Sequence, residues 1–139
     1  MVSIVSADQR RLPGFVAAHY YRRVDDRDAA AEELARHFES AVAFIEQARG
    51  ADFSVFVHCG AGISRAPSVA IAYVMWKLGL GAADALRLVK AARPCVRPNP
   101  GFVAQLKAWE GRLSAMPAKP PVDSGTCAGS CPRLDSSVL

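Results

Sequence analysis

The chain has 139 residues, long enough for one domain with a buried core and too short for two. Hydrophobic residues make up 51% and charged residues 22%, and the net charge of +4 suits an anionic ligand without the basic stripe of a nucleic-acid-binding protein. The longest apolar run, residues 66–76, is too short to span a membrane. We therefore expect neither nucleic acid nor membrane as a partner. Four cysteines without a visible signal segment favour reduced thiols in a cytoplasmic or nuclear setting.

The first half of the chain is predicted to contain three strands and one helix. Residues 2–5 read as a short strand and residues 20–24 as a second strand. Apolar residues at every third or fourth position predict a helix from about residue 29 to residue 49, which Gly50 ends. The almost fully apolar run at residues 53–57 is typical of a strand that is buried on both faces.

The second half is predicted to be helical. The expected helices are residues 65–78, 82–92 and 101–115, and a proline-rich loop at residues 93–100 separates the last two. Pro, Ser, Gly and Asp dominate residues 117–139, which we expect to form a disordered tail. Strands that alternate with helices predict an α/β fold with a mostly parallel central sheet flanked by helices.

The most informative stretch is residues 58–65, His-Cys-Gly-Ala-Gly-Ile-Ser-Arg, between the third strand and the next helix. In parallel sheets, ligands bind where a strand turns into a helix. Glycines let backbone N–H groups point at an anion, and the helix N-terminus adds its positive end. Arg65 can close such a phosphate cup with two parallel N–H bonds, and the same field stabilises a thiolate at Cys59. The residues predict a nucleophilic thiolate in a phosphate site, with an inert buried cysteine as the alternative.

This His-Cys-x5-Arg pattern resembles the protein tyrosine phosphatase superfamily, and in its details the dual-specificity branch. The resemblance covers about residues 1–115 and includes the helix around Phe38 and the segment Arg93–Leu106. It implies a phosphatase-like catalytic domain at residues 1–116 that looks shortened at its N-terminus. It also implies a protein phosphatase that forms a cysteinyl-phosphate on a phosphoprotein substrate, without metal or cofactor. It does not indicate an oligomeric state.

The same resemblance assigns roles within the loop. It makes Cys59 the nucleophile, and it makes Arg65 the residue that binds the phosphate and stabilises the transition state. His58 is implied to help hold the thiolate. The residues whose backbone N–H groups are implied to line the substrate site are Gly60, Ala61, Gly62, Ile63, Ser64 and Arg65.

The general acid is expected in the acidic run that precedes the first long helix. In related sequences it lies about ten residues before the phenylalanine that Phe38 matches, which selects Asp28. Asp26 would fit only with a two-residue insertion, and this alternative stays open. The remaining acidic residues are interpreted as a solvated turn that caps the helix.

The remaining cysteines and two residues of the proline-rich loop receive structural interpretations. Cys95 is expected to pack within the proline-rich loop, with a role as redox partner of the nucleophile as the alternative. Cys127 and Cys131 are too few ligands for a metal site and are interpreted as unpaired thiols. The resemblance places Arg97 and Asn99 beside the active site, where a surface charge and a structural amide are the simpler interpretations.

One position departs from the family pattern. Most relatives carry Ser or Thr after the arginine, with a hydroxyl thought to stabilise the departing thiolate, whereas this chain has Ala66. The expected consequence is a slower second step. The leading hypothesis is a phosphatase for phosphotyrosine, with phosphoserine and phosphothreonine as further candidate substrates. Two alternatives are a weakly active or inactive phospho-binding module, and a sulfur-transfer or arsenate-reducing enzyme, which His58 disfavours.

Overall fold

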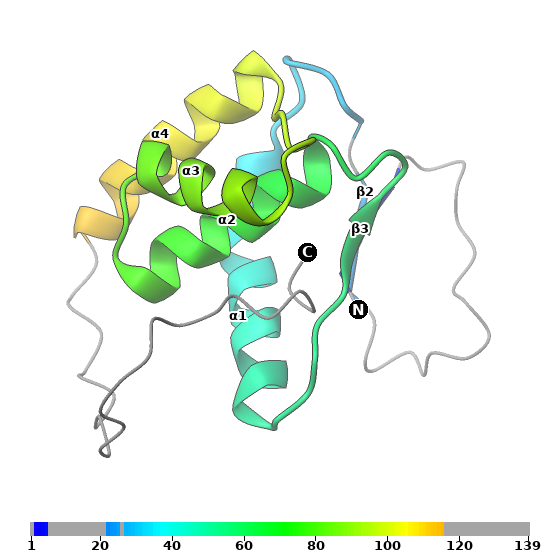
Figure 1. The fold of residues 1–139 in the computed structure, drawn as a ribbon, viewed down its shortest axis with the longest axis vertical. Coiled ribbons are helices and arrows are strands. Elements are labelled where there is room, and N and C mark those ends of the chain that lie inside the picture. The colour runs from blue at the N-terminus through cyan, green and yellow to red at the C-terminus, as the bar shows by residue number, and fades with distance from the viewer. Residues whose placement is uncertain (1, 6–21, 26, 116–139) are drawn as a thin grey trace.

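The computed structural model describes residues 2–5, 22–25 and 27–115, and Figure 1 shows their arrangement. Within these residues the elements are, in chain order, β1 (Val2–Val5), β2 (Arg22–Asp25), the short 3-10 helix η2 (Leu34–His37), α1 (Phe38–Gly50), β3 (Val57–Cys59), α2 (Arg65–Leu78), α3 (Ala82–Ala92) and α4 (Pro100–Ala115). The tail expected at residues 117–139, with its two cysteines, lies outside the described residues.

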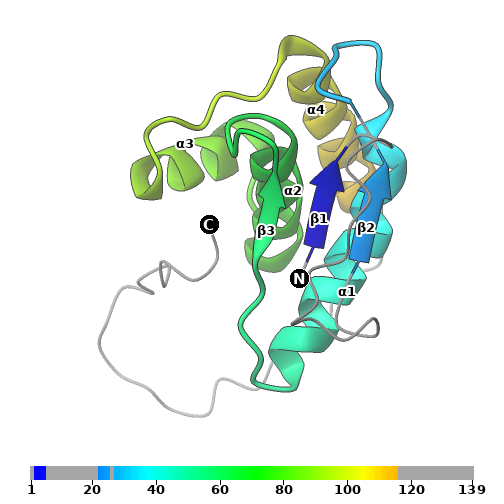
Figure 2. The same cartoon turned by 90° about the vertical axis from the view of Figure 1, so that its right-hand side faces the viewer.

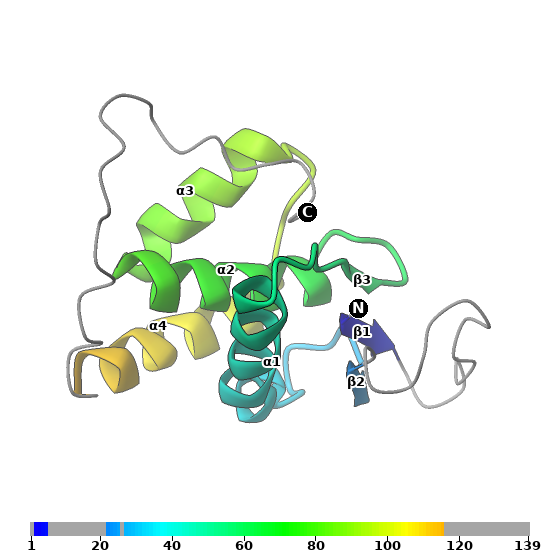
Figure 3. The same cartoon turned by 90° about the horizontal axis from the view of Figure 1, so that it is seen from below.

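The three described strands form one parallel sheet with the order β2-β1-β3. Val2 of β1 is paired with Arg22 of β2 and with Val57 of β3. The described helices lie on one face of this sheet, as the two turned views show (Figures 2 and 3). Parallel strands packed beside helices agree with the predicted α/β class, while the full central sheet flanked by helices stays a prediction.

The third strand begins later than predicted. The apolar run at residues 53–57 predicted a strand buried on both faces, but β3 begins only at Val57. Val55 and Val57 are buried, whereas Phe53 is 52% exposed and Phe56 is 56% exposed. The prediction of two buried faces is therefore wrong, because the described helices cover only one face of the sheet.

The first long helix also begins later than predicted. It starts at Phe38, directly after the short 3-10 helix η2, and residues 27–33 before η2 form a loop. Helix α4 binds the backbone near this loop, since Gln105 Nε2 donates to the carbonyl of Glu32 (2.6 Å) and Gln105 Oε1 accepts from the N–H of Ala35 (2.8 Å). These tertiary contacts satisfy one backbone group on each side of the start of η2. The alanines at residues 29–31 form a loop although alanine favours helices.

The three C-terminal helices follow the prediction closely. Helix α2 ends at Leu78, and its C-cap Gly79 has a φ of +65°, the left-handed conformation that glycine adopts readily. Helix α4 begins at Pro100, one residue before the predicted start, because proline is well tolerated in a first turn. Among the described residues no single helix is long and apolar enough to cross a membrane, although α2 and α3, bent by 117°, meet that criterion as a pair.

Helix α2 lies at the centre of the core. Its residues Ala66–Met75 are all buried, which confirms the buried helix predicted from the apolar run. It packs against α1, α3, α4 and β3. Phe38 and Trp109 meet edge to face at 5.9 Å, and Trp109 Nε1 donates to the carbonyl of Ala72 at 3.3 Å. The N-terminus of α2 is thus held by packing along the whole helix.

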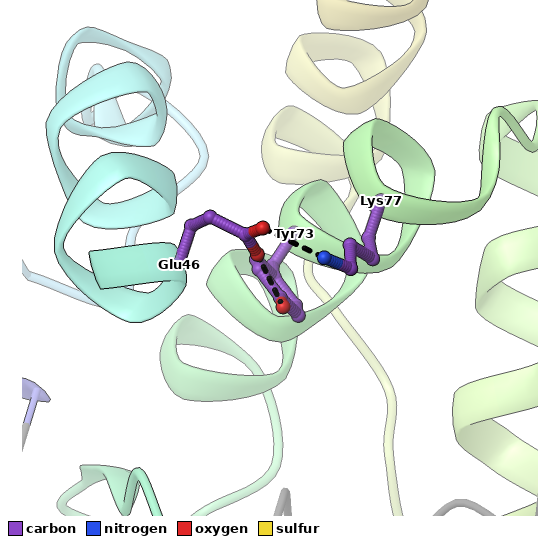
Figure 4. A network of polar contacts seen from close by, with 3 residues as sticks. All are labelled: Glu46, Tyr73 and Lys77. Carbon is purple, nitrogen blue, oxygen red and sulfur yellow. Dashed lines mark hydrogen bonds and ion pairs between the residues drawn. The ribbon is translucent and has the colours of Figure 1, made fainter. Parts of the chain in front are cut away.

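A polar network joins α1 to α2 (Figure 4). Glu46 Oε2 accepts a hydrogen bond from the Tyr73 hydroxyl at 3.0 Å, and Glu46 Oε1 accepts one from Lys77 Nζ at 2.7 Å. Burial, together with the neighbouring Glu46 carboxylate, raises the pKa of Tyr73 to about 12. The folded chain therefore favours the neutral phenol.

Tyr73 is expected to make the fold less stable in alkali. The unfolded phenol loses its proton near its reference pKa of 10.0, whereas the folded phenol holds it until about 12. This contribution to stability is present below the unfolded pKa and is lost as the pH rises through the folded pKa. Urea unfolding between about pH 9 and 11 should show a steeper loss for the wild type than for Tyr73→Phe. A difference in tyrosinate absorbance between the two proteins that titrates near 10 would contradict this expectation.

Candidate active site

Residues 59–65 form a tight loop between the end of β3 and the first turn of α2, as predicted. Gly62 has a φ of +67°, and its N–H donates to Cys59 Sγ at 3.2 Å. The carbonyl of Ser64 accepts from both the N–H (3.0 Å) and the hydroxyl (2.8 Å) of Ser68 in the first turn of α2. The loop thus directs a backbone donor at the cysteine sulfur, which suits a thiolate.

Two glycines of this loop make room for two arginines. A Cβ atom at Gly60 would lie 3.3 Å from Arg65 Nη2, and a Cβ atom at Gly62 would lie 3.0 Å from Arg93 Nη2. Both guanidinium groups therefore lie against the loop. Arg65 was predicted here, whereas Arg93 was not assigned to the site, because its position depends on how the proline-rich loop folds back toward the cysteine.

A pocket of about 260 Å³ opens beside Cys59. Its lining residues are Phe56, Val57, His58, Cys59, Gly60, Ala61, Gly62, Ala66, Pro67, Ala70 and Arg93. One part of the lining is the glycine-rich loop with Arg93, and the other part is mostly apolar and comes from residues 56–58 and the first turns of α2. Such a pocket can hold an anion beside the sulfur and an apolar group next to it.

His58 lies in β3 directly before the cysteine. Its ring stacks on Phe56 with a centroid separation of 5.3 Å and an interplanar angle of 15°. Burial lowers the pKa of His58 below its usual value of 6.5, so the neutral imidazole is favoured. A role in holding the thiolate stays a prediction.

Asp28 meets the loop at the end that joins α2. Its Oδ1 accepts hydrogen bonds from Ser64 Oγ at 2.7 Å and from Asn99 Nδ2 at 2.8 Å. The backbone N–H of Asn99 also donates to Ser64 Oγ at 3.0 Å. The structure therefore brings Asp28 to the cysteine loop, while Asp26, the alternative acid, lies outside the described residues.

Sequence reasoning undervalued the proline-rich loop. It included Ser64 only for its backbone and interpreted Asn99 as structural, although both side chains contact the candidate acid. The side chain of Arg97 is exposed, in line with the surface-charge interpretation, and its N–H donates to the carbonyl of Ile63 at 2.8 Å. The resemblance of this segment to a family segment beside the active site was the available signal.

The packing role predicted for Cys95 is wrong. Its side chain is exposed, because it lies in the loop between α3 and α4 on the surface of the molecule. Cys59 and Cys95 are both free thiols, so they form no disulfide with each other. Within residues 27–115 and the two described strands before them, no cluster of three or more His, Cys, Asp or Glu side chains is placed to hold a metal ion.

Comparison with known proteins agrees with the family that the loop resembles, the dual-specificity branch of the protein tyrosine phosphatase superfamily. Residues 13–112 match the family model for the dual specificity phosphatase catalytic domain, and the chain belongs to this family. Human dual specificity protein phosphatase 8 is 38% identical over 117 residues, which are 82% of this chain and 19% of that protein. The chain thus spans about a fifth of that relative's length.

Solved structures show the same similarity. The crystal structure of human DUSP28 matches with a TM-score of 0.73 and 37% identity, over 82% of this chain and 79% of that one. The human tyrosine phosphatase-like serine/threonine/tyrosine-interacting protein matches with a TM-score of 0.76 and 32% identity, over 81% of this chain and 77% of that one. Phosphatase folds are therefore the structural neighbours of this chain.

Gly62→Ala is expected to damage the anion site, because alanine is strained at this φ and its methyl group would meet Arg93. Gly79→Ala is the matched control, since it has a φ of +65° with no heavy atom within 4 Å of the new methyl group. Both variants should lose about 1–2 kcal/mol of unfolding free energy in urea titrations. Only Gly62→Ala should also bind vanadate more weakly in a competition assay. Unchanged vanadate affinity in that variant would contradict the importance of the loop conformation.

Proposed function

We propose that this chain hydrolyses phosphate monoesters on proteins, at phosphotyrosine and also at phosphoserine and phosphothreonine, through a cysteinyl-phosphate intermediate. The observation that carries the proposal is that Cys59 lines a pocket beside a loop against which the guanidinium groups of Arg65 and Arg93 lie. The N–H of Gly62 in this loop donates to the cysteine sulfur. Family membership and relatives named as dual specificity and tyrosine phosphatases support it. These comparisons do not favour a binding module without turnover.

In the first step, the thiolate of Cys59 attacks phosphorus and the bond from phosphorus to the leaving oxygen breaks. Backbone N–H groups of the loop and the guanidinium of Arg65 bind the non-bridging oxygens as their charge redistributes. Asp28, held beside the loop by Ser64 and Asn99, gives its proton to the leaving oxygen. The product is a neutral alcohol or phenol and a phosphorylated cysteine.

In the second step, water attacks the phosphocysteine. Asp28, now a carboxylate, takes a proton from the water as its oxygen bonds to phosphorus, and the bond from phosphorus to sulfur breaks. The thiolate of Cys59 is regenerated and phosphate leaves. Ala66, which lines the pocket and is 4% exposed, offers no hydroxyl to the departing sulfur.

The finer features of the fold and setting are proposals as well. The phosphatase structures that this chain resembles support a catalytic domain at residues 1–116 with a central sheet flanked by helices. A phosphoprotein is the proposed partner. The cytoplasm or nucleus is the proposed setting, because the nucleophile requires a reduced thiol.

Cys59→Ser is the direct test of the proposed function. The variant should lose turnover of phosphopeptides, because a serine hydroxyl is a far weaker nucleophile than a thiolate, but should still bind a phosphotyrosine peptide through the loop and Arg65. Release of phosphate and peptide affinity should be measured on phosphotyrosine, phosphoserine and phosphothreonine peptides. Turnover close to that of the wild type would refute the mechanism. Binding without any turnover by the wild type would support the binding-module alternative.

Ala66→Ser is expected to accelerate hydrolysis of the phosphoenzyme. A hydrogen bond from a neutral donor to an anion contributes about 1.5–3 kcal/mol, which corresponds to roughly 10- to 150-fold in rate if the transition state realises all of it. The wild type should therefore release a burst of leaving group before slow turnover. Rapid-quench kinetics should show a smaller burst and a faster steady state in Ala66→Ser, with an unchanged burst rate. A wild type without a burst, and without a gain from the added hydroxyl, would mean that the first step limits turnover.

A further inference from the structure

We propose that Ser64 and the start of α4 form a preformed seat for the general acid, and that Ser64, Asn99 and Gly101 are positioning residues for the reaction. No residue from Asn99 to Gln105 lines the pocket beside Cys59, so the segment can act on the reaction only by positioning other groups. The inference rests on the proposed function, because it assigns Asp28 the role of proton donor.

The hydroxyl of Ser64 can point in only one useful direction. Its oxygen accepts the backbone N–H of Asn99 at 3.0 Å, so its own proton is directed to another acceptor, which is Asp28 Oδ1 at 2.7 Å. Ser64 is only 5% exposed, and water therefore competes poorly for this proton. Through this serine, the backbone at the start of α4 determines where the carboxylate lies.

The amide of Asn99 is oriented just as firmly. Its Oδ1 accepts the N–H of Phe102 at 2.9 Å, which caps the first turn of α4. Because the carbonyl end of the amide is occupied by this cap, Nδ2 must face Asp28, to which it donates at 2.8 Å. The cap and the contact to the acid thus come from opposite ends of one side chain.

Both donors bind the same oxygen of the carboxylate. Since Asp28 Oδ1 accepts from Ser64 and from Asn99, Oδ2 is the oxygen that is better placed to carry the proton. A fixed Oδ1 also restricts rotation of the carboxyl group. The seat therefore selects which oxygen donates to the leaving group and keeps it in one orientation before substrate binds.

Gly101 lets the backbone of the acid loop approach α4. A Cβ atom at Gly101 would lie 2.1 Å from the carbonyl oxygen of Ala30, two residues after Asp28, which is shorter than any permitted contact. Gly101 is helical and has no positive φ, so this close approach, and not the backbone conformation, requires a glycine. One turn further along α4, Gln105 Nε2 donates to the carbonyl of Glu32. The same helix therefore holds both the side chain of the acid and the loop that carries it.

The test compares Gly101→Ala with Gly111→Ala in the same helix, where a Cβ atom would meet nothing within 4 Å. Gly101→Ala should displace the acid loop and lower kcat/KM about tenfold or more for phenyl phosphate and a phosphotyrosine peptide, which need a proton donor. The kcat/KM of Gly101→Ala should change little for an aryl phosphate whose leaving group departs without a proton. Gly111→Ala should match the wild type on all three substrates. The rate of Cys59 alkylation by iodoacetate should be the same in all three proteins.

Asn99→Ser gives a second, independent test. Serine still caps α4 but is too short to reach Asp28, so the variant separates the two contacts of the asparagine. Its kcat/KM should fall about tenfold on phenyl phosphate, the usual effect of losing a hydrogen bond to a charged group. Its kcat/KM should change little on the aryl phosphate whose leaving group needs no proton. Asp28→Asn alone should lower kcat/KM for phenyl phosphate about 10²- to 10⁴-fold. Combined with Asp28→Asn, Asn99→Ser should cause no further loss.

The outcomes separate this inference from the proposed function. If Cys59→Ser keeps turnover, the phosphatase mechanism is wrong, and the proposed positioning of Asp28 as proton donor is then wrong as well. If Cys59→Ser and Asp28→Asn are both inactive on phenyl phosphate but Gly101→Ala and Asn99→Ser behave like the wild type, only the seat is wrong. A loss that is equal on all substrates, or that persists in the Asp28→Asn background, would show a purely structural role and would also overturn the seat.

Discussion

The burial of α2 is the constraint on which the site depends. Residues Ala66–Met75 are buried against three helices and a strand, so the N-terminus of α2 cannot shift unless the core repacks. The loop after Cys59 is consequently held at one end by β3 and at the other end by this helix. Backbone dipoles stabilise a transition state efficiently only if they need no reorganisation during the reaction. A helix fixed along its length supplies that rigidity.

Helix α4 provides a second support that is built from distant parts of the chain. The contact of Asp28 with Ser64 joins residues 36 positions apart, and its contact with Asn99 joins residues 71 positions apart. The loop of the nucleophile, by contrast, is local in sequence. Contacts between distant residues form only when the intervening chain has folded. A partly folded domain would therefore present the thiol without a positioned acid.

Sequence reasoning succeeded where the signal was local. It predicted the nucleophile loop and the range of α2, because a loop of small residues, a first-turn proline and the terminal Gly79 act on their neighbours. It failed where tertiary contacts decide. The alanine-rich stretch before η2 forms a loop although alanine favours helices, and Gln105 of α4 binds the backbone directly after it. The role of Asn99 could not be read from spacing alone. Phe56 reads as a core residue in the sequence but is 56% exposed in the structure.

The glycine at the start of α4 has a practical consequence for engineering this domain. Glycine in a helix costs about 1 kcal/mol relative to alanine, so a redesign guided by helix propensity would replace Gly101 and Gly111 alike. Only Gly111 has open space around it, whereas a side chain at Gly101 collides with the backbone of Ala30. Activated aryl phosphates, whose leaving group departs without a proton, report the nucleophile and overlook the proton donor. A screen that relied on them would therefore accept a Gly101 variant whose acid loop is displaced and whose activity toward protein substrates is low.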